Sequence, residues 1–446
     1  MTCEEKRITI NLTKLFGGSV KLFTENLKEL FKNGAHDELL MDIYLDENKL
    51  DYQRQRYVDA IARYESLYGA DDVCIYSAPG RSEIGGNHTD HQNGEVLAAS
   101  VNLDAIAIVK PLDEMVVKVV SGNYPMVTVD LNNLAKKDSE EGTTLALIKG
   151  VLAGVKERGG NVGGFQTYIT SDVLIGAGLS SSAAFETVIG TITSGLYNDM
   201  KISAVDIAII GQYAENYYFG KPCGLMDQMA CSVGNLVHID FADKKNPVID
   251  PVSCDFAKYG YSLCITDTKG SHADLTDDYA AVPAEMRAAA AVLGQELLHG
   301  VTMEQLLDNA AAIREKAGDR AYLRAIHFVN ENVRVQQEVA ALRAEDFEGF
   351  LKVVKASGDS SYKFLQNVYT NHDVQHQNVS IALAVSESVL GNNGVCRVHG
   401  GGFAGTIQAF VKNEAVAEYK AVMYKVFGKD ACNVLKIRKY GGMKVL

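Results

Sequence analysis

Residues 172–186, DVLIGAGLSSSAAFE, place two glycines and three serines between an apolar run and a run of helix-forming residues. The apolar residues 173–175 predict a strand, and the residues from Ala183 onward predict a helix. A glycine-rich turn that enters a helix gathers unpaired backbone N–H groups at the positive end of the helix dipole, where phosphate binds well. An ordinary turn with a serine N-cap is the alternative. The stretch therefore predicts a phosphate loop or a serine-capped turn.

Three further segments carry reactive side chains beside glycines. They are APGRSEIGGNHTDHQNG at 78–94, AENYYFGKPCGLMDQM at 214–229 and VHGGGFAGT at 398–406. None of the glycine-rich segments is a Walker A loop, because no Gly-Lys-Ser/Thr follows. None has the dinucleotide fingerprint in a βαβ setting, so a nicotinamide cofactor is not expected.

The elements that must position these segments alternate irregularly between helix and strand. Residues 1–70 have a mostly helical pattern, strand patterns begin near residue 73, and residues 284–355 are again rich in helix formers. This order predicts an α+β protein. The segment KKNPVIDPVSC at 244–254 holds two of the seven prolines and marks a boundary. We expect a helical extension at 1–70 and domains at 71–250 and 251–446.

Composition excludes several functional classes. The net charge is −13, which argues against nucleic acid or an anionic membrane as a partner. No apolar run reaches the roughly 20 residues that span a bilayer, and the N-terminus has no signal-peptide pattern. The eight cysteines include no CxxC pair, so neither a zinc site nor a disulfide framework is indicated. A cytoplasmic location is expected.

The four segments, in this order, resemble the GHMP family of small-molecule kinases and, within it, the galactokinase branch. The family's GAGLSSSAA loop is reproduced at 176–184, and its signature GRVNLIGEHTDYNGG is matched imperfectly at 80–94. Its CGIMDQ element appears as CGLMDQ at 223–228, and its GGGFGG turn as GGGFAG at 400–405. The resemblance covers about residues 73–445. It implies a two-domain α+β fold, ribosomal-S5-like then ferredoxin-like, with the active site in the interdomain cleft.

The resemblance implies that ATP is bound through its phosphates and that Mg²⁺ accompanies it. The phosphate-binding residues would be Gly176, Ala177, Gly178, Leu179, Ser180, Ser181 and Ser182. The Ser182 hydroxyl and the Glu215 carboxylate match the family's magnesium ligands, and hard oxygen donors suit this ion. A solvated helix carboxylate is the alternative for Glu215.

Asp227 and Arg81 are the catalytic residues that the resemblance implies. The aspartate would lie beside the anomeric hydroxyl of a sugar, where it accepts or steers the proton as the oxygen attacks the γ-phosphorus. The arginine would keep Asp227 ionised and stabilise charge on the transferred group. An isolated structural ion pair is the alternative.

The sugar contacts implied by the resemblance are Asn87, His88, Asp90, Gly224 and Tyr279. Three signature positions depart from the galactokinase pattern: Asn87 replaces a glutamate, His91 replaces a tyrosine and Glu83 replaces an asparagine. Loss of the glutamate removes a charge that would repel an acidic sugar. A metal site at His88, Asp90 and His91 is a further alternative.

The predicted reaction converts ATP and galactose or a galactose-like sugar into ADP and the sugar 1-phosphate. Galacturonate or another modified hexose is the alternative substrate, and a non-catalytic sensor of sugar and ATP is the alternative of another class. The expected partners are small molecules only. The oligomeric state is open, and a monomer is compatible with the sequence.

Overall fold

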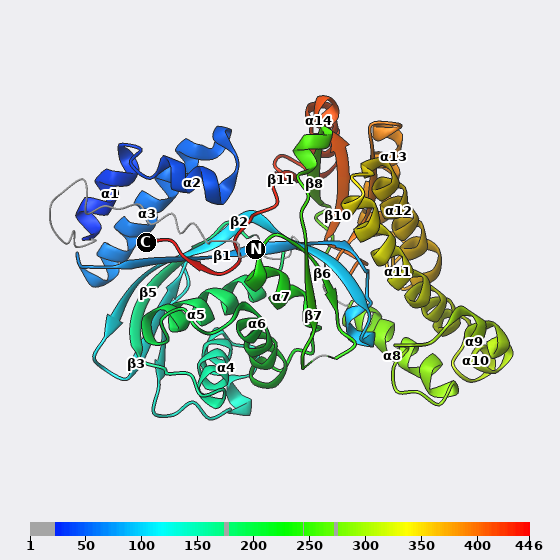
Figure 1. Ribbon diagram of the computed structural model, residues 1–446, viewed down its shortest axis with the longest axis horizontal. Helices are drawn as coiled ribbons and strands as arrows, with labels where there is room; N and C mark the ends of the chain where they lie inside the picture. Colours follow the sequence, from blue (N-terminus) through cyan, green and yellow to red (C-terminus); the bar gives the residue numbers. More distant parts are fainter. Residues whose placement is uncertain (1–22, 174–177, 244, 272–274) are drawn as a thin grey trace, which may run out of the picture.

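The computed structural model describes residues 23–173, 178–243, 245–271 and 275–446 and contains two β-sheets (Figure 1). The larger sheet has the order β12-β1-β2-β5-β3-β4, with β6 added to β2 and β7 to β6. Its strands are β1 (Cys74–Gly85), β2 (Glu95–Leu112), β3 (Val116–Ser121), β4 (Val127–Asp130), β5 (Gly164–Ser171), β6 (Leu236–Asp240), β7 (Val248–Val252) and β12 (Met443–Lys444). The smaller sheet has the order β11-β8-β10-β9. Its strands are β8 (Tyr261–Asp267), β9 (Gly394–His399), β10 (Thr406–Lys412) and β11 (Cys432–Leu435).

The long antiparallel pair β1–β2 forms the centre of the larger sheet. Ile75 lies opposite Ile108 in this pair, and the register shifts between Pro79 and Arg81 and again between Glu83 and Gly85. Such irregularities bend a strand and redirect its side chains, and they often adjoin functional sites. The two shifts therefore bracket the part of β1 that carries Arg81.

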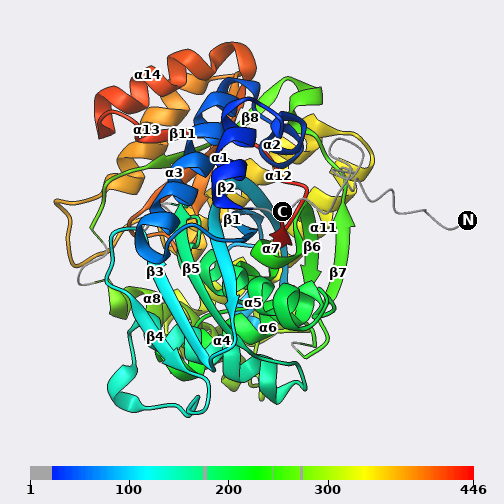
Figure 2. The same cartoon turned by 90° about the vertical axis from the view of Figure 1, so that its left-hand side faces the viewer.

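Helices cover both faces of the larger sheet (Figures 1 and 2). On one face are α4 (Thr144–Glu157), α5 (Ser181–Tyr197), α6 (Ala204–Tyr213) and α7 (Met226–Val233). On the other are α1 (Thr24–Lys32), α2 (Asp37–Tyr44) and α3 (Leu50–Tyr68). Strand residues alternate accordingly: Ile106 packs with the N-terminal helices, whereas Ala107 packs with α4 and α5.

The second half of the described chain is largely helical around the smaller sheet. Its helices are α8 (Thr276–Val292), α9 (Met303–Asp308), α10 (Ala310–Lys316), α11 (Asp319–Arg343), α12 (Phe347–Ser360), α13 (Asn378–Leu390) and α14 (Val416–Phe427). Tyr419 and Leu390 of α14 and α13 pack on one face of this sheet, and Phe350 of α12 packs on the other. No helix within the described ranges is long and apolar enough to cross a membrane.

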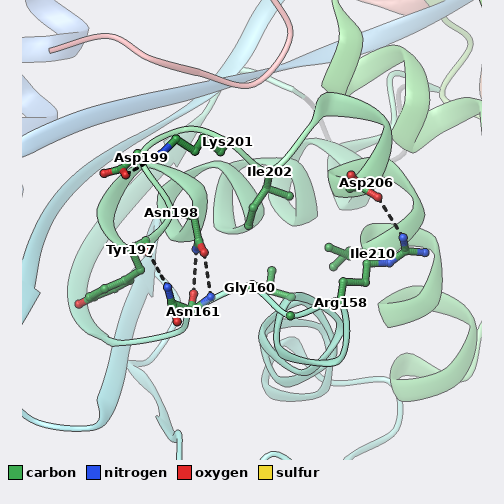
Figure 3. Close-up of a pocket in the computed structure, with 12 residues that line it drawn as sticks. Arg158, Gly160, Asn161, Tyr197, Asn198, Asp199, Lys201, Ile202, Asp206 and Ile210 are labelled. Carbon is green, nitrogen blue, oxygen red and sulfur yellow. Dashed lines mark hydrogen bonds and ion pairs between the residues drawn. The ribbon is translucent and has the colours of Figure 1, made fainter.

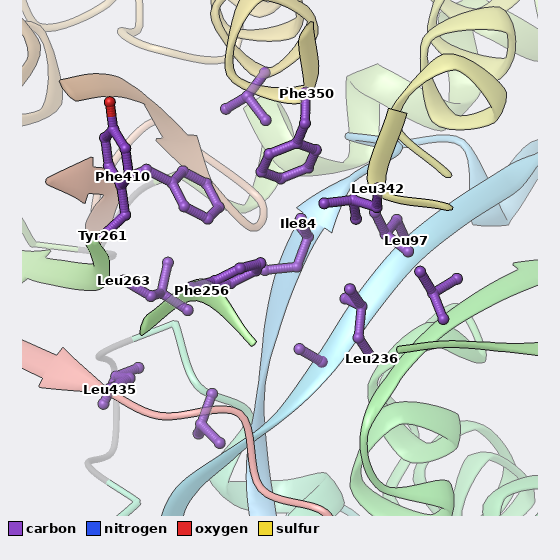
Figure 4. Packing of buried hydrophobic residues seen from close by; sticks show 14 of the residues in the cluster. Ile84, Leu97, Leu236, Phe256, Tyr261, Leu263, Leu342, Phe350, Phe410 and Leu435 are labelled. Atoms are coloured by element: carbon purple, nitrogen blue, oxygen red, sulfur yellow. The ribbon is translucent and has the colours of Figure 1, made fainter. Parts of the chain in front are cut away.

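An apolar core joins the two sheets (Figure 4). Leu97 of β2 contributes to the same buried cluster as Leu342 of α11, Phe350 and Phe410. The last strand also joins the larger sheet, because β12 pairs with β1, and Ile437 forms a β-bridge with Val101 of β2. Burying each large apolar side chain contributes about 1.5–3 kcal/mol, so this cluster fixes the sheets against one another.

Candidate active site

The predicted phosphate loop joins β5 to α5, and its second half is described. Gly176 and Ala177 lie outside the described residues, whereas residues 178–182 approach and enter the first turn of α5. Ser180 has left-handed backbone angles, φ 58° and ψ 67°, which cost a non-glycine residue roughly 1–3 kcal/mol. Its hydroxyl makes no capping bond to the described residues of α5. The described geometry therefore does not support the serine-capped turn.

Gly178 lies closely against the turn between β9 and β10. A Cβ atom on Gly178 would overlap Thr406 Oγ1 and would come within 3.0 Å of His399 Nδ1. Only a glycine with its positive φ of 67° fits here. The loop and the Gly400–Gly402 region therefore meet at the boundary between the two sheets.

Arg81 and Asp227 form a bidentate ion pair although they are far apart in sequence. Arg81 Nε lies 2.6 Å from Asp227 Oδ1, and Arg81 Nη2 lies 2.7 Å from Oδ2. The Ser180 hydroxyl also donates to Oδ2 at 2.7 Å. Arg81 further binds the loop itself, through its side chain to Gly178 O and its backbone N–H to Leu179 O at 3.1 Å.

The environment of Asp227 keeps its carboxyl group ionised. Burial alone would raise the pKa of Asp227, but the charge and hydrogen bonds of Arg81, together with the Ser180 hydroxyl, hold it below its usual value. Asp227 also lies in the first turn of α7, where the helix dipole favours a negative charge. About a third of the side chain, 31 %, is exposed, so the ionised group remains accessible.

Ser182 and Glu215, the two predicted magnesium ligands, lie together. The Ser182 hydroxyl donates to Glu215 Oε1 at 3.2 Å, and Lys221 Nζ lies 3.0 Å from the same oxygen. Gln228 Nε2 donates to the other carboxylate oxygen, Glu215 Oε2, at 2.8 Å and so fixes the orientation of the carboxylate. Glu215 belongs to a π-helical turn, η5 (Ala214–Phe219), a feature often found at functional sites.

This donor set suits a magnesium ion that arrives with a nucleotide. It offers one hydroxyl and one carboxylate, both hard oxygen donors, and leaves other positions for phosphate and water. Within the described ranges, no group of three or more His, Cys, Asp or Glu residues is arranged to hold a metal by itself. The geometry thus gives no support to a metal site at His88, Asp90 and His91.

Three of the predicted sugar contacts converge on the triple-glycine turn. Asn87 Nδ2 donates to Gly400 O at 2.8 Å, and Tyr279 Oη donates to Gly402 O at 2.8 Å. Between them, His88 Nε2 lies 3.0 Å from Gly401 O. Three residues from the signature and from α8 therefore bind three successive carbonyls of one turn.

The other two predicted sugar contacts touch one another. A Cβ atom on Gly224 would overlap Asp90 Oδ2, so the carboxylate lies directly against the glycine backbone. Asn216 and Gln212 hold the preceding residue, Cys223, through its backbone. The turn before α7 is thereby fixed beside the signature loop.

Asn87 differs from the other predicted sugar contacts because it is completely buried. Besides Gly400, its Nδ2 donates to Glu83 Oε1 at 3.1 Å, and its Oδ1 accepts from Asn367 Nδ2 at 2.9 Å. Glu83 is paired with the buried Arg397, and burial raises the pKa of Glu83 to about 7 despite this partner. The described contacts use both ends of the Asn87 amide within the protein.

Several residues of the site were not singled out from the sequence. Gln228 links Glu215 to Glu186, whose Oε1 is buried with no partner among the described residues. Lys221 pairs with Glu215. Both Gln228 and Lys221 lie in segment 214–229, which also contains the predicted site residues Glu215 and Asp227. Their closeness to Asp227 in the sequence could have identified them. Glu186 lies two residues after the phosphate-loop match at 176–184 and could have been found in the same way.

A cavity elsewhere in the larger-sheet region shares no residue with this site (Figure 3). It has a volume of about 570 Å³ and lies where α4 and α5 end and α6 begins. Arg158 pairs with Asp206 at its edge, and Asn161 and Asn198 bind one another across it. These groups are engaged with each other, and the cavity is not part of the candidate active site.

Comparison with known proteins defines the family of the chain. The family "GHMP kinases N terminal domain" matches residues 146–235, and "Galactokinase galactose-binding signature" matches residues 62–111. The first match contains the phosphate loop and Asp227, and it defines the class of kinase. A galactokinase of Actinobacillus pleuropneumoniae is 30% identical over 370 residues, covering 80% of this chain and 91% of the relative. A galactokinase of Streptomyces coelicolor is 30% identical over 363 residues, covering 81% and 90%.

Solved structures show the same fold. A Lactococcus lactis galactokinase complexed with galactose has a TM-score of 0.74 at 23% identity, covering 86% of this chain and 98% of that one. A mevalonate kinase has a TM-score of 0.54 at 15% identity, covering 82% and 99%. The chain belongs to the galactokinase family of the GHMP kinases.

Proposed function

We propose that this protein is an ATP-dependent galactose 1-kinase, which transfers the γ-phosphoryl group of ATP to the anomeric hydroxyl of the sugar. One observation carries the proposal. Asp227 is ionised and partly exposed, and it is held by Arg81 and Ser180, the residue at which the phosphate loop enters α5. A carboxylate and a phosphate-binding turn at hydrogen-bonding distance are what a hydroxyl phosphotransferase requires.

Asp227 would orient the sugar hydroxyl and take up its proton. Among the described residues, Oδ2 accepts from Arg81 and Ser180, whereas Oδ1 accepts from Arg81 and keeps a lone pair for the hydroxyl. As the oxygen–phosphorus bond forms, the bond between the γ-phosphorus and the β–γ bridging oxygen breaks and ADP leaves. The lowered pKa makes Asp227 a weak base, which favours late uptake of the proton after a loose transition state.

Ser182 and Glu215 would hold the magnesium ion that accompanies ATP. When bound there, the ion would supply positive charge to the phosphates of ATP. The protein's own part is to keep the Glu215 carboxylate fixed, which Gln228 does through its amide. Lys221 lies close enough to Glu215 to add positive charge at the phosphates.

The burial of Asn87 bears on which sugar is bound. A residue whose amide is used by Glu83, Gly400 and Asn367 does not present a neutral side chain to the sugar. The glutamate-to-asparagine change is then a matter of internal packing and gives no reason to prefer an acidic sugar. We therefore propose galactose, the sugar named for the relatives, ahead of galacturonate.

The setting of the reaction follows from its chemistry. Transfer from ATP and the seven free cysteines in the described part of the chain favour the reducing, ATP-rich cytoplasm. The division into domains at 71–250 and 251–446, after an extension at 1–70, remains part of the proposal. We also propose that the sugar is contacted by His88, Asp90, Gly224 and Tyr279.

A coupled assay of ADP release tests the proposal directly. The protein is supplied with ATP, Mg²⁺ and one of galactose, galacturonate, N-acetylgalactosamine or glucose, and the product is checked as the sugar 1-phosphate. We expect galactose to give the highest kcat/KM. A clear preference for galacturonate would replace the substrate, and tight sugar binding without ADP release for any sugar would indicate a sensor.

A further inference from the structure

The helix α3 of the N-terminal extension contacts the residue that leads into the phosphate loop. Asp172 directly follows β5 and precedes the loop. Tyr52 Oη donates to Asp172 Oδ1 at 2.8 Å, and Arg56 Nη1 lies 3.3 Å from Asp172 Oδ2. One carboxylate is thus held by two side chains that lie one helical turn apart on α3.

The anchor on α3 is itself rigidly held. Arg56 is only 7% exposed; its Nη1 lies 2.6 Å from Asp104 Oδ1, and its Nη2 donates to Asp104 O at 2.7 Å. The same Asp104 carboxylate accepts from Tyr44 at 2.9 Å and pairs with Arg438 at 2.8 Å. Separating a buried ion pair costs a large amount of free energy, so Arg56 is held firmly in place.

Asp172 is also fixed through its backbone. Its N–H donates to Asp104 O at 2.9 Å, the carbonyl that Arg56 also binds. The next residue, Val173, lies against Gly80, where an added Cβ atom would come within 3.0 Å of the valine side chain. The entry to the loop is therefore held by α3 and β1, while Arg81 holds its exit through Leu179 O.

We propose that Tyr52 and Arg56 are positioning residues for the nucleotide site, acting through Asp172, which makes the N-terminal helices part of the ATP-binding apparatus. The proposal rests on the proposed function. A loop that binds phosphate with backbone N–H groups must have those groups already aimed, because ordering it during binding reduces affinity. Releasing one end should weaken nucleotide binding although neither side chain touches the nucleotide.

The test uses Tyr52→Phe in the full chain, which removes one hydroxyl and keeps the ring. A hydrogen bond to a partly exposed carboxylate contributes enough for about a 3- to 10-fold rise in the Kd for ADP, measured by calorimetry. The KM for ATP should rise by a similar factor, whereas kcat, the KM for sugar and the melting temperature should stay close to wild type. Asp172→Asn loses the charge that faces Arg56 but keeps an oxygen that can accept from Tyr52, so it should also weaken ADP binding. The double variant, which loses both interactions, should weaken ADP binding more than either single variant.

Tyr68→Phe is the matched control. Its hydroxyl donates from the same helix to Thr167 O at 3.3 Å, within β5 and away from the loop. ADP affinity should be unchanged in this variant. If Tyr52→Phe and Asp172→Asn bind ADP as wild type does, or if Tyr68→Phe weakens it equally, the positioning role is refuted. Absence of ADP binding by the wild-type protein would instead overturn the proposed function, and the positioning role with it.

Discussion

Replacing Asp227 with asparagine tests the central assignment, because it removes one charge and keeps the shape of the side chain. The carbonyl of the introduced amide can accept from only one side of the Arg81 fork, so one guanidinium N–H loses its partner. Loss of an oriented base and its charge lowers rates by about 10²–10⁴, which corresponds to roughly 3–5 kcal/mol in the barrier. Breaking a buried ion pair costs about 3–5 kcal/mol of stability. Because 31% of the Asp227 side chain is exposed, we expect a smaller loss of about 1–3 kcal/mol.

Three measurements separate the catalytic effect from the structural one. Coupled ADP release at saturating galactose and ATP gives kcat, calorimetry gives the Kd for ADP, and urea denaturation gives the free energy of unfolding. Asp206→Asn is the control, since Asp206 is also a first-turn aspartate paired with an arginine, Arg158. Its ion pair is largely exposed and should contribute little. We expect kcat to fall by orders of magnitude only in Asp227→Asn, with ADP affinity within a few-fold of wild type in both variants.

Two outcomes would contradict the reasoning. A kcat within ten-fold of wild type would show that Asp227 neither accepts nor steers the proton. A large loss of ADP affinity, with kcat restored at high ATP concentration, would show that Asp227 acts mainly by holding Ser180 and the phosphate loop.

Three further predictions concern the buried network and the metal ligands. Asn87→Asp turns the donor to Glu83 and Gly400 into an acceptor, so urea denaturation should show a loss of about 2–6 kcal/mol; an equally stable variant with altered sugar preference would contradict the packing role. The pKa of Glu83 is about 7 in the folded chain and near 4.5 in a free side chain, so the folded state holds this proton more tightly. The stability that the bound proton contributes is complete below pH 4.5 and is lost as the pH rises through 7. The free energy of unfolding of wild type should therefore fall relative to that of Glu83→Gln over this range. A difference between the two that does not depend on pH would refute the raised pKa of Glu83. Glu215→Gln should raise the Mg²⁺ concentration for half-maximal rate without weakening ADP binding in the absence of Mg²⁺; an unchanged Mg²⁺ requirement would reject Glu215 as a ligand.

The sequence carried enough information to predict that Arg81 and Asp227 meet. Both lie in short motifs whose order resembles that of the galactokinase family, and the structure brings their charged groups to 2.6 Å. The helical pattern predicted for 1–70 agrees with α1, α2 and α3 from residue 24 onward, and residues 1–22 lie outside the described residues. The predicted α+β fold is confirmed by the likeness to solved structures. The helical pattern can be read from the residues of one chain, whereas the meeting of Arg81 with Asp227 was implied by the resemblance to the family.

The environment of Asn87 could not be predicted in this way. Its character depends on Glu83, on Asn367 and on Arg397, which come from β1, from the segment after α12 and from β9. No local pattern links positions separated by nearly three hundred residues. The resemblance therefore predicted Asn87 as a sugar contact, whereas its buried amide is hydrogen-bonded to Glu83, Gly400 and Asn367. The contact of Tyr52 with Asp172 could not be predicted for the same reason, since it joins α3 to the residue after β5, 120 positions further along the chain.

Arg81 contributes both to the catalytic carboxylate and to the phosphate loop. Its guanidinium holds Asp227, and it also binds the carbonyl groups of Gly178 and Leu179 through its side chain and backbone. Asp227 should therefore affect the rate alone, and Tyr52 the nucleotide affinity alone. Arg81→Lys should lower both, because a single ammonium group cannot reproduce a bidentate contact and also reach the loop. An Arg81→Lys variant with reduced kcat and wild-type ADP affinity would show that the backbone N–H at position 81 suffices to hold the loop.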